Sequence, residues 1–229
     1  MKKKVLVVDI GGTHVKLMIS QSETRKFDSG MNFSPRQLAP AIKKTAAGWK
    51  YDAISIGFPS VVKKGRIKKD PKHLAGGWVD WDFGKSLGKP TRVINDASMQ
   101  ALGSYRAGRM LFLGLGTGLG SALVWEKNLL PLELGDLPYE GGIIEHVLGK
   151  VGFDRLGKKE WTRHVLFCLK RLKLSFIADT VVVGGGLIHE LDAALPEGIE
   201  PGDNRNSYLG GVRMWDTDAR TRRPKWNVM

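Results

Sequence analysis

The chain has 229 residues, 42% of them apolar, which is enough for one large folded domain or two smaller ones. Its net charge of +13 indicates a polyanionic partner or merely a basic surface, and nucleic acid, an anionic membrane and polyphosphate all fit it. No apolar run approaches the roughly 20 residues that cross a bilayer. The apolar stretch after the basic N-terminus is short and ends at Asp9, so we expect a buried strand there and a cytoplasmic protein.

The chain contains one cysteine, Cys168, within an apolar segment. A single thiol allows neither an intrachain disulfide nor a multi-cysteine zinc site. Its apolar neighbours favour a packed core thiol over a nucleophile. We therefore expect no zinc.

The first half of the chain predicts alternating strands and helices. Residues 5–9 form an apolar run that meets a Gly-Gly turn, and residues 15–20 continue as the returning strand of a hairpin. Residues 53–59 read as a buried strand that runs into a loop, and residues 92–96 as a third strand. A helix with one apolar side is predicted over 97–107.

The second half repeats the arrangement of strand, glycine turn and strand, without close sequence identity. A strand at 110–115 and a returning strand at 121–125 flank a second glycine turn, and an amphipathic helix is predicted over 159–174. A buried strand at 180–183 ends at three glycines. We therefore expect two α/β lobes, residues 1–107 and 108–229. The polar, basic tail after Arg213 is expected to be mobile.

The two glycine turns are candidate phosphate cradles. Glycine lets several backbone N–H groups approach phosphate oxygens without a Cβ in the way, while Asp9 supplies a carboxylate for Mg²⁺, directly or through water. Plain hairpin turns without a ligand are the alternative. Neither the Walker A pattern nor the dinucleotide-binding pattern is present. The predicted phosphate-binding residues are Asp9, Gly11, Gly12, Thr13, Lys16, Gly116, Thr117 and Gly118.

Four motifs in order carry a family resemblance: Asp9–Thr13, Asn95–Ala97, Leu115–Gly120 and Gly184–Gly186. They resemble those of ROK-family sugar kinases, within the actin, hexokinase and Hsp70-like superfamily, and especially of polyphosphate glucokinases. The resemblance covers roughly residues 4–214. It implies an α/β fold with two ribonuclease H-like lobes around a central cleft, the actin-like ATPase fold.

The resemblance also implies roles for single residues. Asp96 is similar to the catalytic base that takes the proton from a sugar 6-hydroxyl, although its place before a helix also suits an N-cap. Glu133 is similar to a sugar-binding carboxylate; its leucine neighbours suggest a buried acid that needs a partner, and a surface carboxylate is the alternative. The implied sugar ligands are Asn95, Glu133, Asp136, Gly57 and Pro59, and the implied donor-binding residues are Gly184, Gly185 and Gly186.

Two departures bear on the sugar. Asp136 stands where most ROK kinases have a histidine, and a structural turn is its alternative role. His73 stands where many relatives have an asparagine that contacts the sugar. The cysteine cluster of zinc-containing ROK kinases is missing, as it is in polyphosphate glucokinases. These departures leave the identity of the hexose open.

The expected function is transfer of a phosphoryl group to the 6-hydroxyl of a hexose, glucose above all, from polyphosphate, ATP or both, with Mg²⁺. An ATP-dependent sugar or amino-sugar kinase and a non-catalytic polyanion-binding protein on a kinase fold are the alternatives. Six basic residues within 63–72 form either a solvated loop or a track for the polyanion. Motifs for nucleic acid are absent, so we do not expect that partner; ROK kinases commonly form dimers, and a homodimer fits the resemblance.

Overall fold

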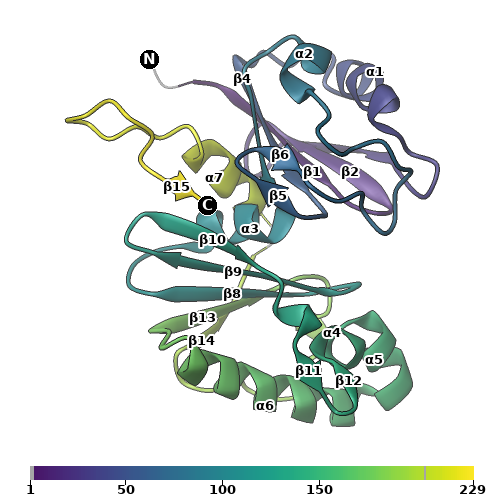
Figure 1. Cartoon of the computed structure of the whole chain (residues 1–229), viewed down its shortest axis with the longest axis vertical. Helices are drawn as coiled ribbons and strands as arrows, with labels where there is room; N and C mark the ends of the chain where they lie inside the picture. The colour runs from purple at the N-terminus through teal and green to yellow at the C-terminus, as the bar shows by residue number, and fades with distance from the viewer. Residues whose placement is uncertain (1–2, 204) are drawn as a thin grey trace.

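The protein is described from a computed structural model that covers residues 3–203 and 205–229. Figure 1 shows two lobes stacked along the long axis, each built on a mixed β-sheet. The first sheet has the strand order β3-β2-β1-β4-β7 and the second has the order β14-β13-β8-β9-β10-β15. The mixed α/β architecture predicted from the sequence is therefore confirmed.

The first sheet is covered on both faces, which explains its nearly uninterrupted apolar strands. Along β1 (Val5–Ile10), Leu6 and Val8 face a core shared with α1 (Pro35–Thr45) and α2 (Phe83–Leu87), while Val5 and Val7 face the other lobe. Strand β1 pairs antiparallel with β2 and parallel with β4. The remaining strands of this sheet are β2 (His14–Met18), β3 (Thr24–Asp28), β4 (Ala53–Phe58) and β7 (Thr91–Asn95).

The second sheet repeats the strand–glycine turn–strand arrangement. Strand β8 (Met110–Leu115) pairs antiparallel with β9 (Leu119–Trp125), as β1 pairs with β2. Its outer face is covered by α4 (Ile144–Leu148), α5 (Lys150–Leu156) and α6 (Lys158–Ser175). The remaining strands are β10 (Asn128–Leu132), β13 (Thr180–Gly184), β14 (Ile199–Pro201) and β15 (Asn227–Val228).

Two helices fill the space between the sheets. Helix α3 (Asp96–Ser104) and helix α7 (Asn206–Arg213) lie between the two lobes in Figure 1. They belong to one apolar cluster that also takes in Val7 from the first sheet and Phe112 from the second. The lobes are therefore joined by a continuous core as well as by the chain.

The contact between α3 and α7 depends on glycine. A Cβ on Gly103 would lie 1.8 Å from the carbonyl oxygen of Asn206, and a Cβ on Gly210 would lie 1.8 Å from that of Met99. Arg213 fastens the pair, because its guanidinium donates to the carbonyl oxygens of Leu102, Gly103 and Tyr105 at 2.6, 3.2 and 2.8 Å. These bonds satisfy carbonyls that a helix end leaves without partners.

The segment after Arg213 forms a turn and a short strand, and its expected mobility stays a prediction. The Asp218 carboxylate accepts hydrogen bonds from the backbone N–H groups of Arg220 and Thr221, both at 3.0 Å, which forms a turn. The chain then adds β15 to the second sheet, parallel to β10. The tail thus runs from α7, which packs on the first sheet, to the edge of the second sheet.

Short elements complete the described part of the chain. The hairpin of β5 (Val62–Lys63) and β6 (Arg66–Ile67) lies in the first lobe, and η1 (Leu134–Asp136), β11 (Pro138–Tyr139), β12 (Gly142–Ile143) and η2 (Ile188–Glu190) lie in the second. None of the helices in the described ranges is long and apolar enough to cross a membrane.

We predict that Gly210→Ala destabilises the protein. The added methyl group would overlap the Met99 carbonyl, and overpacking of this kind costs about 1–3 kcal/mol or more. Gly84→Ala is the control, because the nearest atom to its added Cβ lies at an ordinary 3.5 Å. Urea unfolding of both variants checks this, and equal unfolding free energies would contradict close packing of α3 on α7.

Candidate active site

A cavity of about 440 Å³ lies between the two lobes. Its wall combines the ends of β1, β4 and β7 in the first lobe with the β8–β9 turn and η1 in the second. Residues that are far apart in sequence therefore meet here. The sequence-predicted residues on this wall are Gly11, Gly12, Pro59, His73, Asn95, Asp96, Gly116, Thr117, Gly118, Glu133, Asp136 and Gly185.

The first glycine turn is held in a fixed shape. Ser29 donates its hydroxyl to the Gly11 carbonyl at 2.7 Å and its backbone N–H to the Thr13 carbonyl at 2.9 Å. A Cβ on Gly12 would lie 2.8 Å from the Cβ of His73, so the turn and His73 can approach only because Gly12 has no side chain. This geometry suits a loop that presents backbone N–H groups to a ligand.

The second glycine turn is held by helices of its own lobe. The Gly116 carbonyl accepts a hydrogen bond from the backbone N–H of Lys150 at 2.9 Å, where α5 begins. A Cβ on Gly118 would lie 2.3 Å from the carboxylate of Glu145, which reaches the turn from α4. Gly118 therefore provides the space that Glu145 occupies.

Asp96 is the first residue of α3 and is not its N-cap. The Asn95 side chain caps the helix by accepting from the Ser98 N–H at 3.1 Å, so the capping alternative for Asp96 is wrong. One Asp96 oxygen accepts from the Ala97 N–H at 2.8 Å. The Asp96 carboxyl lies on the cavity wall, where it can receive a ligand hydroxyl.

Asp96 and Asp9 share a poorly solvated region. Burial, and next the charge of Asp9, raise the pKa of Asp96 to about 7. Burial also raises the pKa of Asp9, opposed by a hydrogen bond from Ser207 and by the charge of Lys16. Lys16 faces Asp9 across the β1–β2 ladder, so strand register places this cation.

The acidic end of the cavity, which lies beside the second glycine turn, is lined by acids and lysines together. Glu133, Asp136 and Glu145 come from the second lobe, and Lys69 and Lys72 come from the first. Partial loss of solvent inside the cavity, and next the charges of Asp136 and Glu145, raise the pKa of Glu133. Glu133 itself is exposed to the cavity rather than buried among its leucine neighbours, which corrects the sequence-based expectation.

One ion pair crosses the mouth of the cavity between the lobes. The Lys72 Nζ lies 3.0 Å from Glu145 Oε1. The other Glu145 oxygen, Oε2, lies 3.4 Å from the backbone N of Leu119 beside the second glycine turn. This contact links the basic loop of the first lobe to the phosphate-cradle candidate of the second.

Two of the predicted glycines, Gly57 and Gly185, are required by packing and by the course of the chain. Gly57 serves packing, since a Cβ there would lie 2.4 Å from the Met99 side chain that supports α3. Gly185 has a φ of +88°, and a Cβ on it would lie 2.1 Å from the Leu115 carbonyl, so the chain turns there only with glycine. The predicted residues off the wall are Asp9, Thr13, Lys16, Gly57, Gly184 and Gly186.

Several residues of the wall were missed by sequence reasoning. Glu145 belongs to no motif that we recognised, and only the packing of α4 on η1 brings it to Gly118 and Asp136. Lys72 and Lys69 had been noticed only as part of a basic run. Ala97, Leu119 and Gly120 belong to the recognised motifs but were given no role. Other residues on the wall that the sequence analysis did not single out are Ser60, Val61, Asp70, Gln100, Phe112, Gly114 and Gly135.

The oxygen atoms near Asp9 fit a hard cation. Asp9 contributes a carboxylate, and the Ser207 hydroxyl lies 3.2 Å from its Oδ2. Mg²⁺ binds through one or two carboxylates and keeps several waters, so a site of this kind needs few protein ligands. Burial raises the pKa of both Asp9 and Asp96, and the charge of Asp9 adds to this at Asp96, so a bound cation would favour their ionised forms.

Comparisons with known proteins agree with the fold and the motifs. No protein-family model matches the chain. A polyphosphate glucokinase of Mycobacterium leprae is 25% identical over 213 residues, which covers 82% of this chain and 65% of that protein. The chain therefore spans just under two thirds of that relative's length.

Solved structures with the same fold include sugar kinases. The inorganic polyphosphate/ATP-glucomannokinase from Arthrobacter sp. strain KM has a TM-score of 0.78 and 24% identity, and covers 91% of this chain and 96% of its own. A ROK family glucokinase from Streptomyces griseus has a TM-score of 0.73 and 18% identity, with coverage of 91% and 97%. The predicted resemblance to ROK kinases and the actin-like ATPase fold are confirmed.

We predict that Asp96→Asn gains stability relative to wild type as the pH rises. The folded-state pKa of about 7 lies above the ordinary 3.8, so protonation contributes stability that is complete below about pH 4 and is lost as the pH rises through 7. Asparagine does not ionise, so the free energy of unfolding of Asp96→Asn relative to that of wild type rises with pH, by up to about 4 kcal/mol over the whole range. Urea unfolding without divalent cations, at about pH 5 and about pH 8, checks this; a constant difference would contradict a raised Asp96 pKa.

Proposed function

We propose that this chain, whose relatives and structural neighbours are ROK-family sugar kinases, phosphorylates the 6-hydroxyl of a hexose, with glucose as the first candidate. Polyphosphate, ATP or both would donate the phosphoryl group. The observation that carries the proposal is Asp96: its carboxyl lies on the wall of one cavity that also includes both glycine turns and the acids Glu133, Asp136 and Glu145. A base on that wall could act on an acceptor hydroxyl next to a phosphoryl donor held by the turns.

The proposed step uses Asp96 as the general base. Its carboxylate accepts the proton of the sugar hydroxyl as the hydroxyl oxygen attacks the terminal phosphorus, and the bond from that phosphorus to the rest of the donor breaks. The products are a sugar phosphate and a donor shorter by one phosphoryl group. A pKa of about 7 suits this role, because such a group is substantially deprotonated near neutral pH and still basic enough to take the proton.

The glycine turns would stabilise the charge on the transferred group. Both turns line the cavity, from opposite lobes. Gly11 and Gly116 donate their N–H groups within the turns, to the carbonyls of His14 and Gly118 at 3.0 Å, so the N–H groups of Gly12, Thr117 and Gly118 would be the ones that converge on phosphate oxygens. Lys16 adds a positive charge beside Asp9. Mg²⁺, held by Asp9 directly or through water, would neutralise charge on the donor phosphates.

The sugar would bind at the acidic end. Glu133 and Glu145 offer carboxylates to sugar hydroxyls, and Asn95, whose side-chain amide donates to the Ser60 carbonyl at 3.3 Å, offers a positioned side chain beside Asp96. Asp136 and His73 also line the cavity, in place of the histidine and asparagine that many ROK kinases use. If the protein prefers a hexose other than glucose, these two residues are the proposed reason.

The charge of the chain supports polyphosphate as a donor. Net charge is +13, and the M. leprae relative carries the name polyphosphate glucokinase. The basic run does not act as one surface, because Lys69 and Lys72 line the cavity while Lys68 pairs with Asp80 at 2.9 Å. Any contact of the run with the donor would therefore come from its second half.

The first test is formation of sugar 6-phosphate from glucose with Mg²⁺, with polyphosphate and ATP supplied separately. We expect turnover in wild type and a loss of about 10² to 10⁴ in rate for Asp96→Asn, since that variant lacks the base. Turnover with one donor alone would identify the donor. Asp192→Asn, at an exposed site outside the cavity, is the control and keeps its activity.

No turnover with either donor across a panel of hexoses and amino sugars would overturn the kinase proposal. Salt-dependent binding of polyphosphate without turnover would then favour a polyanion-binding protein.

A second test addresses Glu133. Glu133→Gln removes a charged hydrogen-bond acceptor, so we expect KM for the sugar to rise about 10- to 100-fold with a smaller change in kcat. Glu197→Gln, also exposed but outside the cavity, is the control. A change in kcat alone, with KM unchanged, would place Glu133 outside the sugar site.

A further inference from the structure

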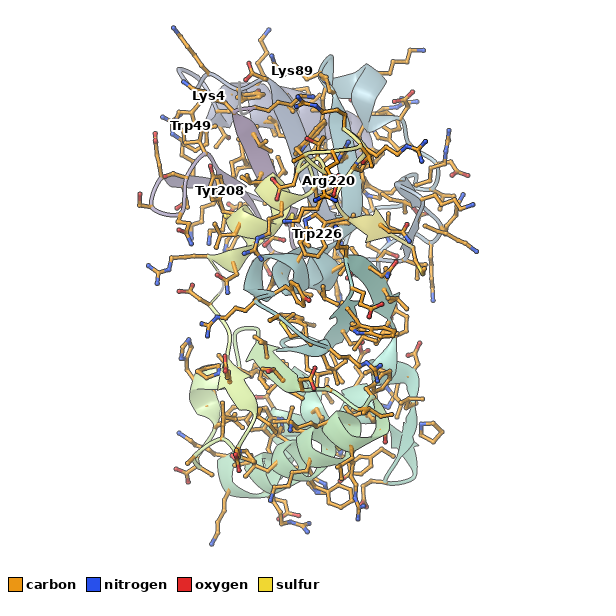
Figure 2. The ribbon with its side chains drawn as sticks, turned by 90° about the vertical axis from the view of Figure 1, so that its left-hand side faces the viewer. Lys4, Trp49, Lys89, Tyr208, Arg220 and Trp226 are labelled. Carbon is orange, nitrogen blue, oxygen red and sulfur yellow. The ribbon has the colours of Figure 1, made fainter. Side chains whose placement is uncertain are left out.

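A second cavity, of about 580 Å³, lies apart from the candidate active site. Its walls come from the β5–β6 turn, the start of α2, the strand β7 and the C-terminal tail. Strand β7 is the edge of the first sheet, so the cavity lies beside a row of backbone groups without a neighbouring strand. In Figure 2 the tail, with Trp226 labelled, crosses the face where the two lobes meet.

Three cations line this cavity: Lys64, Arg66 and Arg92. None of them has a carboxylate within ion-pair distance in the described ranges, 3–203 and 205–229. The acid on the wall, Asp82, is engaged in capping α2 through the Lys85 N–H at 2.9 Å. The three cations outnumber the one acid on the wall, so the cavity lining keeps a net positive charge.

Arg92 is fixed in place. Its guanidinium lies 4.4 Å from the centre of the Trp215 ring and also donates to the Met214 carbonyl. The guanidinium carries five N–H donors, so donors remain for an anion. A half-buried, oriented guanidinium of this kind is a favourable partner for phosphate oxygens.

The rest of the wall is apolar and aromatic. Phe83, Met214, Trp226 and Val228 line it, and the Trp226 ring is held edge-on by Tyr105 at 5.6 Å between centroids. The indole nitrogens of Trp81 and Trp226 are buried and find no acceptor in the part of the chain that the structure describes. Buried donors without a partner are unusual in folded proteins.

We propose that this cavity binds an organic phosphate. The phosphate group would lie against Lys64, Arg66 and Arg92, and an apolar or aromatic body would lie against Phe83, Trp226 and Val228. A volume of about 580 Å³ is within the range of pockets that hold small organic ligands. The proposed site assigns a role to the first half of the basic run, which the candidate active site does not use.

The walls of the site give ligand binding a structural consequence. One wall belongs to the first lobe, and the other belongs to the tail, which pairs with β10 of the second lobe at Asn128–Asn227 and Leu129–Val228. A ligand that contacts both walls would hold the tail against the first lobe. Bound ligand should therefore slow hydrogen exchange of the backbone amides in the tail.

The test uses phenyl phosphate as the probe and the indole N–H resonance of Trp226, assigned with Trp226→Phe. We expect a saturable shift with phenyl phosphate, weaker binding of inorganic phosphate and of phenol, and slower exchange of the tail amides in the complex. Lys64→Ser and Arg66→Ser should each weaken binding about tenfold, since each removes one charged contact. The readouts do not depend on kinase activity.

Lys63→Ser is the matched control. Lys63 is exposed and faces Arg66 in the β5–β6 hairpin, but it lies outside the cavity wall, so its removal should leave binding unchanged. An absent or unsaturable shift would overturn the proposal. Unchanged affinity for phenyl phosphate in Lys64→Ser and Arg66→Ser would also overturn it. So would inorganic phosphate that binds as tightly as phenyl phosphate.

Discussion

The close contact of α3 with α7 is the constraint on which the rest of the structure depends. Two helices can lie this near only where both lack side chains, and Gly103 and Gly210 meet that condition. The contact sets the distance between the two sheets, because both helices lie in the core that the sheets share. It also fixes Asp96, which begins α3, relative to Ser207 on α7 and to Asp9 on β1.

The candidate active site concentrates charges that the fold does not fully balance. The charge of Asp9, from behind the wall, acts on Asp96, and elsewhere on the wall three acids lie with two lysines. Such an arrangement costs stability and is typical of sites whose charges are matched by a ligand or a reacting group. The Lys72–Glu145 pair joins residues of the two lobes across the same cavity.

The basic loop and the tail show how tertiary structure divides a uniform stretch of sequence. Within residues 63–72, Lys64 and Arg66 face one cavity and Lys69 and Lys72 face another, because the β5–β6 hairpin separates them. The tail is polar and basic, yet pairing with the edge of the second sheet and the Asp218 turn give it a defined path. Charge alone predicts neither outcome.

The sequence by itself determined the local elements and the motifs. Apolar strands that flank glycine turns identified the hairpins β1–β2 and β8–β9, because a hairpin is formed by neighbouring segments of the chain. The two-lobed fold followed from the family resemblance that the ordered motifs carry. Only the tertiary structure decided which side chains meet and what each of them does. Glu145 reaches Gly118 through the packing of α4, Asn95 rather than Asp96 caps α3, and Gly57 supports Met99 instead of lining the cavity. Those outcomes depend on contacts between distant segments, which no local pattern encodes.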